Sequence, residues 1–299
     1  MTTKNTNNAS KLANEKRLAT MRANLAALEK RCEAILADMT GTGENLTQQQ
    51  RADLLMLVNV AYHDSGKIEG CFSIDSCAAC DFCQHMIASA ADNILVICGS
   101  CYAAADAWKE AAWRRHKLNA RIMSSVLFTV DELKALLIPG QLCRFNEDGD
   151  TVNTTMARNY LRIVIGHPHT NFGYWYKNAP AVAAGLAAEG YKTREDLPAN
   201  VRFIHSSLLI GFPAAALWFD DAIFTVYPDA ETTAAAILAG AHECNGRRCR
   251  ACGYTCYLHA RRQEKPLHIA EVLRCNKARR EAARAAYDAK KAQIAALAG

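Results

Sequence analysis

The sequence predicts an α/β fold built on a parallel sheet. Between residues 142 and 240, short apolar stretches end in polar residues and lead into helical stretches, at intervals of about 25 to 30 residues. This alternation is typical of βα units, whose strands pair in parallel. Helical patterns also precede and follow these units, so we expect N- and C-terminal helices to flank the sheet.

The repeated units place polar residues where the strands end. The expected strands cover 142–145, 172–176, 201–205 and 222–227, and the expected helices cover about 154–166, 180–189 and 230–240. Asp150, Lys177, Asn178, Ser206 and Ser207 follow these strands. Ligands of parallel α/β folds bind at the carboxyl ends of strands, although single polar residues there are often only helix caps. We predict that these five residues line a cofactor-binding pocket.

The N-terminal segment is expected to be one long helix. Over residues 11–39, apolar side chains recur at alternating three- and four-residue spacing. Such a stripe fits a helix packed along the main domain, or a coiled coil that joins two copies into a homodimer. Cys32 falls on the stripe and is expected in the core. The predicted regions are an N-terminal helix (1–45), an α/β cysteine-cluster domain (46–241), and a C-terminal region (242–299) with a cluster of four cysteines and a basic helix over about 267–297.

The composition is that of a globular protein of 299 residues, with 51% hydrophobic and 22% charged residues. The chain lacks an apolar run long enough for a transmembrane helix, and its start is polar, unlike a signal peptide. We therefore predict a cytoplasmic protein without membrane association. In a reducing compartment, C-x2-C pairs indicate metal or redox sites rather than structural disulfides.

The clearest cysteine motif lies near the C-terminus. Cys244, Cys249, Cys252 and Cys256 stand within thirteen residues. Four thiolates so close in sequence are able to surround one Zn²⁺ ion or one [4Fe–4S] cluster. The spacing alone leaves both options open.

A second group of cysteines lies in the first half of the chain, at positions 71, 77, 80, 83, 98 and 101. Six thiols exceed the needs of one site and fall short of two complete ones. A subset of three would leave one iron of a [4Fe–4S] cluster open to a substrate or cofactor. His63, His85 and His116 lie nearby and are candidates to replace a cysteine ligand, although positions on helix surfaces or in turns are the simpler explanation.

Positive charge is concentrated near the C-terminus. The net charge is +5, yet residues 242–284 alone carry eleven Lys/Arg against four Asp/Glu, a local charge of +7. A basic segment beside a cysteine cluster is able to contact nucleic-acid phosphates, whereas a solvated helix face is the simpler explanation. Both interpretations stay open here.

In order along the chain, several short motifs resemble a family of phage and mobile-element proteins of the gene product 88 type. The resemblance rests on Cys83, Ile97–Ala103, Asn119, Arg144–Phe145, Gly149–Asp150, Asn159–Tyr160, Phe172–Asn178, Pro198–Arg202, Ser206–Ser207, Phe224–Tyr227 and Cys244–Tyr257. It covers about residues 67 to 272. The family is similar to radical-SAM proteins, which use S-adenosylmethionine.

The resemblance implies a partial (β/α) barrel, at least one [4Fe–4S] cluster, and S-adenosylmethionine as a candidate cofactor. It assigns the first cluster to Cys83, Cys98 and Cys101, across a longer spacing than the C-x3-C-x2-C loop usual in radical-SAM proteins. The C-terminal four cysteines would hold a second cluster or zinc. Our leading hypothesis is thus a radical-SAM-like iron–sulfur enzyme of unknown substrate. The alternative is a zinc-binding, nucleic-acid-binding protein without catalysis.

Overall fold

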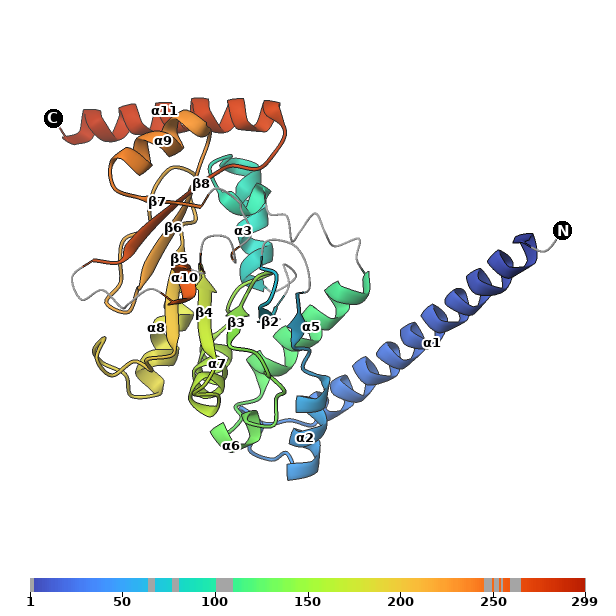
Figure 1. Ribbon diagram of the computed structural model, residues 1–299. Coiled ribbons are helices and arrows are strands. Elements are labelled where there is room, and N and C mark those ends of the chain that lie inside the picture. The colour runs from blue at the N-terminus through green and yellow to red at the C-terminus, as the bar shows by residue number, and fades with distance from the viewer. Residues whose placement is uncertain are drawn as a thin grey trace.

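An eight-stranded sheet forms the centre of the molecule (Figure 1). The structure is a computed structural model that describes residues 3–63, 68–76, 81–100, 110–244, 249, 253, 255–258 and 265–298. The strands are β1 (Ala61–Tyr62), β2 (Phe72–Ile74), β3 (Leu142–Phe145), β4 (Asn171–Tyr176), β5 (Val201–Ser206), β6 (Ala222–Tyr227), β7 (His242–Glu243) and β8 (Leu267–Val272). Their order across the sheet is β1-β2-β3-β4-β5-β6-β8-β7.

The sheet is parallel apart from one edge. Strand β1 runs antiparallel to β2, and each of the other neighbouring pairs is parallel. From β2 to β6, neighbours in the sheet are also consecutive strands in the chain. The predicted α/β class with a parallel sheet is therefore confirmed, and the carboxyl ends of the parallel strands share one edge.

The register divides the strand side chains between two faces. Phe145, Tyr174 and Phe203 are paired across β3, β4 and β5 and share one face. We call this the helix face, because helices cover it. The alternate residues Arg144, Trp175, Ser206, Phe224 and Glu271 lie on the opposite face, which we call the cavity face.

The helix face is buried under aromatic packing. Its main cover is α7 (Thr154–Gly166), which packs against α8 (Ala179–Ala188). The ring of Tyr160 on α7 stacks on Phe145 with a centroid separation of 4.2 Å, and the ring of Phe172 stacks on Phe145 at 5.1 Å. Buried aromatic contacts of this kind stabilise a core beyond their simple area. This face therefore carries the main hydrophobic core.

Polar groups fix the ends and the outer side of α7. The side chain of Asn153 caps the helix by accepting a hydrogen bond from the backbone N–H of Met156 at 3.0 Å. On the exposed side, Arg158 and Arg162 both pair with Glu189 after α8. The apolar side of α7 is thus held against the sheet while its charged side joins the next helix.

The remaining helices surround these layers. They are α1 (Thr3–Ala37), α2 (Gln48–Leu57), α3 (Asp81–Asp92), the 3₁₀ turn η1 (Ile97–Ser100), α5 (Glu110–Ser125), α6 (Val130–Leu133), α9 (Ala230–Leu238), α10 (Thr255–Leu258) and α11 (Lys277–Ala298). Among the described residues, no helix is both long and apolar enough to cross a membrane.

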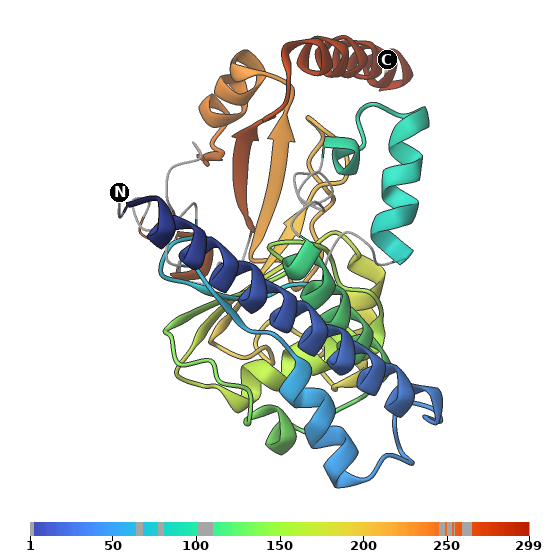
Figure 2. The same ribbon diagram turned by 90° about the vertical axis from the view of Figure 1, so that its right-hand side faces the viewer.

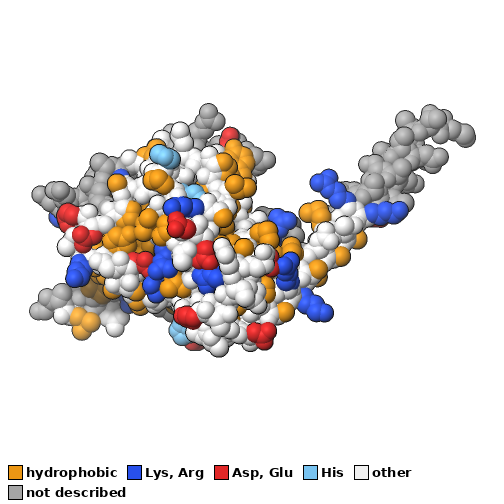
Figure 3. Space-filling model, turned by 90° about the horizontal axis from the view of Figure 1, so that it is seen from below, with side chains coloured by type: hydrophobic (Ala, Val, Ile, Leu, Met, Phe, Trp, Pro, Cys, Tyr) orange, Lys and Arg blue, Asp and Glu red, His pale blue; other side chains and the backbone are white. Residues whose placement is uncertain are grey.

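The N-terminal helix projects from the body of the molecule (Figure 1). Helix α1 projects from the lower part of the molecule in Figure 1 and is seen lengthwise in Figures 2 and 3. Among its described side chains, those of Cys32, Ile35 and Leu36 in the last turns enter the core. The predicted N-terminal helix and the buried position of Cys32 are confirmed. Farther out, Met21 and Leu28 on the predicted stripe are exposed, and pairing with a second copy stays a prediction.

At the C-terminal end, the helix predicted from residue 267 was wrong over its first ten residues. Leu267–Val272 instead forms β8, which pairs with β6 and β7. Leu267 and Ile269 alternate towards the apolar cluster on the cavity face, a strand period that the following basic helix obscured. The 242–299 region consequently contributes two strands to the same sheet as residues 142–227 before α11 begins at Lys277.

Candidate functional site

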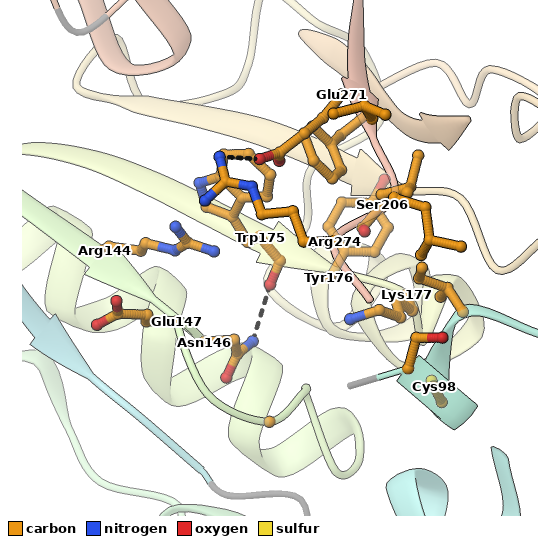
Figure 4. Close-up of a pocket in the computed structure, with 17 residues that line it drawn as sticks. Cys98, Arg144, Asn146, Glu147, Trp175, Tyr176, Lys177, Ser206, Glu271 and Arg274 are labelled. Carbon is orange, nitrogen blue, oxygen red and sulfur yellow. Dashed lines mark hydrogen bonds and ion pairs between the residues drawn. The ribbon is translucent and has the colours of Figure 1, made fainter. Parts of the chain in front are cut away.

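A cavity of about 380 Å³ opens at the carboxyl edge of the parallel strands. Its wall comes from the ends of β3, β4, β5, β6 and β8 and from η1 (Figure 4). This is the edge at which parallel α/β folds bind their ligands. The cavity is therefore the candidate active or binding site.

The cavity combines charged and aromatic side chains. The guanidinium of Arg144 lies 4.3 Å from the ring centroid of Trp175, a cation–π contact. Across the wall, Glu271 pairs with Arg274 at 2.7 Å. Figure 4 shows Arg144 and Glu147 on one side of the cavity and Lys177 and Cys98 on the other. Such a wall suits a small ligand with an apolar or aromatic body and charged groups.

Helix α10, which carries Cys256 of the C-terminal cysteine segment, packs against β4 and β5. Tyr257 of α10 is buried against Gly173 of β4, where an added Cβ would come within 2.5 Å of the tyrosine ring. Gly173 pairs with Arg144 in the sheet register, so the missing side chain makes room directly beside the cavity residues. Burial raises the pKa of the Tyr257 hydroxyl well above its usual range, which keeps that group protonated.

Two of the five predicted cofactor-binding residues lie in the cavity wall, namely Lys177 and Ser206. Asp150 lies behind the wall and is only 1% exposed. Its carboxylate accepts hydrogen bonds from the backbone N–H groups of Thr151 at 2.7 Å and Lys177 at 2.8 Å, and its oxygen lies 4.0 Å from the Lys177 ammonium. Burial raises the pKa of Asp150 in spite of these partners. The residue joins the β3 loop to the end of β4.

The other two predicted residues join neighbouring segments of the chain. Asn178 caps α8, with its side chain accepting from the backbone N–H of Ala181 at 3.5 Å, and it donates to the backbone carbonyl of Thr151 at 2.8 Å. Ser207 accepts from the backbone N–H of Ala214 at 2.9 Å and lies 3.0 Å from the hydroxyl of Thr225. Both residues therefore tie the turn after a strand to another part of the chain.

Among the cysteines predicted for the first cluster, Cys98 lies in the cavity wall. It belongs to η1 and is 8% exposed. Helix α3, which carries Cys83 near its start, packs against η1. Cys101 lies outside the described residues, as do Cys77 and Cys80. The described chain therefore brings one predicted thiol to the cavity and the helix of a second beside it.

Three of the four C-terminal cysteines are described, and each is partly buried. Cys249 packs beside Cys71 and Tyr257, whereas Cys244 packs against the cavity-face cluster. Cys256 contacts both groups. Cys252 lies outside the described residues. Cys71 enters this group from a distant part of the chain; burial raises its pKa to about 12, with Cys249 adding to the effect.

A further group of polar side chains adjoins the cavity through Glu147. The Nε2 atom of His63 lies 2.7 Å from the hydroxyl of Ser73 and 3.1 Å from a carboxylate oxygen of Glu147. Ser73 in turn donates to Asp75 at 2.6 Å. The sequence did not reveal this group, because Glu147 is 72 residues from Asp75 in the chain and each element contributes an ordinary polar residue.

The basic C-terminal region is partly neutralised where it is described. Arg284 of α11 contacts the carboxylates of Asp229, Glu231 and Asp288, and Arg274 pairs with Glu271. The arginines at 247, 248 and 250 lie outside the described residues. Binding of nucleic acid through residues 242–284 stays a prediction.

Comparisons of the chain with protein-family models, with curated proteins and with solved structures found no match. Function is therefore inferred from the residues and geometry of the chain itself.

Proposed function

We propose that this protein is a radical-SAM-like iron–sulfur enzyme that acts on a small molecule held in the cavity. The observation that carries the proposal is the thiol of Cys98 in the cavity wall at the carboxyl edge of the parallel strands. A partial (β/α) barrel would place these strand ends around one ligand. The consecutive order of β2 to β6 supports that architecture.

The ligand set of the proposal is Cys83, Cys98 and Cys101, with a [4Fe–4S] cluster at the cavity mouth. The described residues fit such a group in two respects. Cys98 is buried yet faces the cavity, and the turn that carries it packs against the helix of Cys83. Bound there, a cluster with one open iron would supply an electron to reduce S-adenosylmethionine.

The chain's own residues then bind and orient the ligands. Lys177 offers an ammonium group for a carboxylate, and Ser206 offers a hydroxyl, both from the cavity wall. Trp175 and Phe224, with ring centroids 5.2 Å apart, provide an apolar surface for a ring or alkyl group. Asp150 acts indirectly, because its hydrogen bond to the Lys177 backbone positions that lysine.

The C-terminal cysteines are proposed as a second metal site, holding zinc or another cluster. Cys244 and Cys256 are partly buried against the cavity-face cluster, and Cys249 is partly buried beside Cys71 and Tyr257; partly buried thiols of this kind suit a structural ion. Metal analysis is needed to distinguish the two metals, since both accept tetrahedral thiolates.

The proposal is tested by isolating the protein without oxygen and measuring iron, acid-labile sulfide, zinc and the electron paramagnetic resonance spectrum. We expect a reduced [4Fe–4S] signal that changes when S-adenosylmethionine is added. Cys98→Ser should abolish that change. Cys32→Ser is the matched control, because this thiol is buried at the end of α1, where burial raises its pKa to about 11.

A colourless protein that contains only zinc would contradict the proposal. So would a Cys98→Ser protein whose spectrum still responds to S-adenosylmethionine as the native one does. Replacing Cys77 or Cys80 in parallel would reveal whether the cluster takes a different set of thiolates.

A further inference from the structure

A group of nitrogen and oxygen donors lies beside the cavity, distinct from both cysteine sets. We propose that His63, Asp75 and Glu147 bind a divalent transition-metal ion, with His116 as an additional imidazole ligand. His63 directly follows β1, Asp75 directly follows β2, and Glu147 lies in the loop after β3. Asp75 and Glu147 follow parallel neighbouring strands and so lie at the same edge of the sheet. Strand β1 is antiparallel and places the backbone of His63 beside Cys71, and the imidazole ring extends from there to Ser73 and Glu147.

The spacing of the donor atoms fits one shared ion. Single ligand atoms of the three residues all lie within 4.8 Å of one another. Within this group, Nε2 of His63 lies 3.1 Å from Oε2 of Glu147. Two ligands that each lie about 2.1 Å from an ion, at right angles to each other, are about 3 Å apart. The pair is therefore already separated as neighbouring ligands of one metal ion would be.

Surrounding contacts fix the most buried ligand. Asp75 is 3% exposed, and its Oδ1 accepts hydrogen bonds from the backbone N–H groups of Glu147 at 2.7 Å and Asp148 at 3.2 Å. These bonds hold the β3 loop against β2 and direct Oδ2 towards His63 and Ser73. Hydrogen bonds to a metal-binding side chain orient that side chain and raise the affinity of the site for the metal ion.

A second imidazole approaches the same carboxylate from α5. Nε2 of His116 lies 3.9 Å from Oδ2 of Asp75, and its Nδ1 lies 3.8 Å from Asp148. His116 thus needs only a small side-chain adjustment to enter the ligand set. Its partner Asp148 would then hold the other ring nitrogen, the arrangement that commonly orients metal-bound histidines.

The chemistry of the donors identifies the class of metal. Two imidazoles and two carboxylates favour Mn²⁺, Fe²⁺ or Zn²⁺ over Mg²⁺ and Ca²⁺, which prefer oxygen alone. Three carboxylates, those of Asp75, Glu147 and Asp148, lie within 3.9 Å of the two imidazole rings, and their negative charge favours a cation between them. Glu147 also lines the cavity, so the ion would lie next to a bound ligand.

The test is a titration of the full-length protein with Mn²⁺, followed by the loss of the free-ion electron paramagnetic resonance signal. Mn²⁺ is a suitable probe because it binds nitrogen and oxygen donors in preference to thiolates. We expect one saturable site in the native protein. His63→Gln and Glu147→Gln should each weaken binding at least about tenfold. The matched controls His169→Gln and Glu231→Gln alter exposed residues elsewhere and should bind as the native protein does.

A native protein without a saturable Mn²⁺ site would overturn the proposal, as would undiminished binding by both ligand variants. Co²⁺ added to the native protein gives a second measurement that needs no variant. Visible bands without thiolate-to-cobalt charge transfer are expected, and a charge-transfer band on the first equivalent would assign the ion to the cysteines instead. Iron and sulfide contents of the same preparations report separately on the proposed iron–sulfur function, since His63 and Glu147 are not cluster ligands.

Discussion

The two faces of the sheet differ in what their side chains contact. On the helix face, Phe145, Tyr174 and Phe203 are fully buried against helices and other rings. On the cavity face, their sequence neighbours Arg144 and Trp175 border an open volume and carry charge or a polar edge. Stability and ligand chemistry thus alternate residue by residue along the same strands.

This difference follows from the two-residue period of a strand. One face buries apolar area, which stabilises the fold by about 25 cal/mol for each Å² removed from water. The other face keeps polar groups that are costly to bury unless they are paired, and it retains them where a ligand is able to contact them. A substitution should therefore affect either folding or binding, depending on the face it falls on.

The largest effect is expected from neighbouring substitutions on β3. Phe145→Ala should lower the free energy of unfolding by about 3–5 kcal/mol, because it removes a buried ring that contacts Phe172, Tyr160 and Tyr174. Arg144→Met should cost about 1 kcal/mol, the scale of its cation–π contact with Trp175. Urea denaturation measures both. Equal losses of unfolding free energy in the two variants would contradict the proposed difference between the two faces.

An intermediate effect is expected at the cavity wall and directly behind it. Asp150→Asn should destabilise the protein by about 2 kcal/mol. The carboxylate accepts hydrogen bonds from two backbone N–H groups, and the NH₂ of an amide would leave one of these donors without an acceptor. Lys177→Met should cost less than about 1 kcal/mol, since this partly exposed side chain lies in the wall rather than behind it. Thermal unfolding of the two variants checks this. The reverse ranking would mean that Lys177, not Asp150, holds the wall together.

The smallest effect is expected at the contact between α2 and α6. Arg51 donates to both carboxylate oxygens of Glu132 and lowers its pKa to about 2 from an ordinary value of 4.5. Because the folded-state pKa is the lower one, this stabilisation is present above about pH 4.5 and is lost as the pH falls towards about 2.

Glu132→Gln should therefore cost about 1–2 kcal/mol at pH 7, a value reduced for the partial exposure of the pair. The gap to the native protein should close as the pH falls towards about 2. Urea unfolding at a series of pH values measures this difference in the free energy of unfolding, and Glu231→Gln at an exposed position is the control. A gap that stays constant across this range would show that the pair does not respond to acid.

Periodicity and turn chemistry were sufficient to predict much of the fold. Strands β3 to β6 and helices α7, α8 and α9 follow from apolar runs that end in polar residues. The N-terminal helix follows from its stripe. Strand β8 was missed because its six residues precede a basic helix and carry a histidine and a glutamate. Its strand period becomes evident only once Leu267 and Ile269 are seen to pack against β6.

For the site, the sequence predicted the edge of the sheet but not the full set of residues on it. Lys177 and Ser206 lie in the cavity as expected, whereas Asp150, Asn178 and Ser207 hold turns behind it. Arg144, Trp175 and Glu271 were missed as cavity residues. They lie inside strands, where a charged or aromatic residue gives no local sign of the face it occupies.

The sequence by itself determined the α/β class, the order of the βα units and the two clusters of cysteines, because these depend on local period and spacing. The tertiary structure alone decided which residues meet. It brings Cys71 to Cys249 and His63 to Glu147, and it sets Cys98 in the wall of the cavity. These contacts join segments that are far apart in the chain, and sheet order and register, rather than any local pattern, determine them.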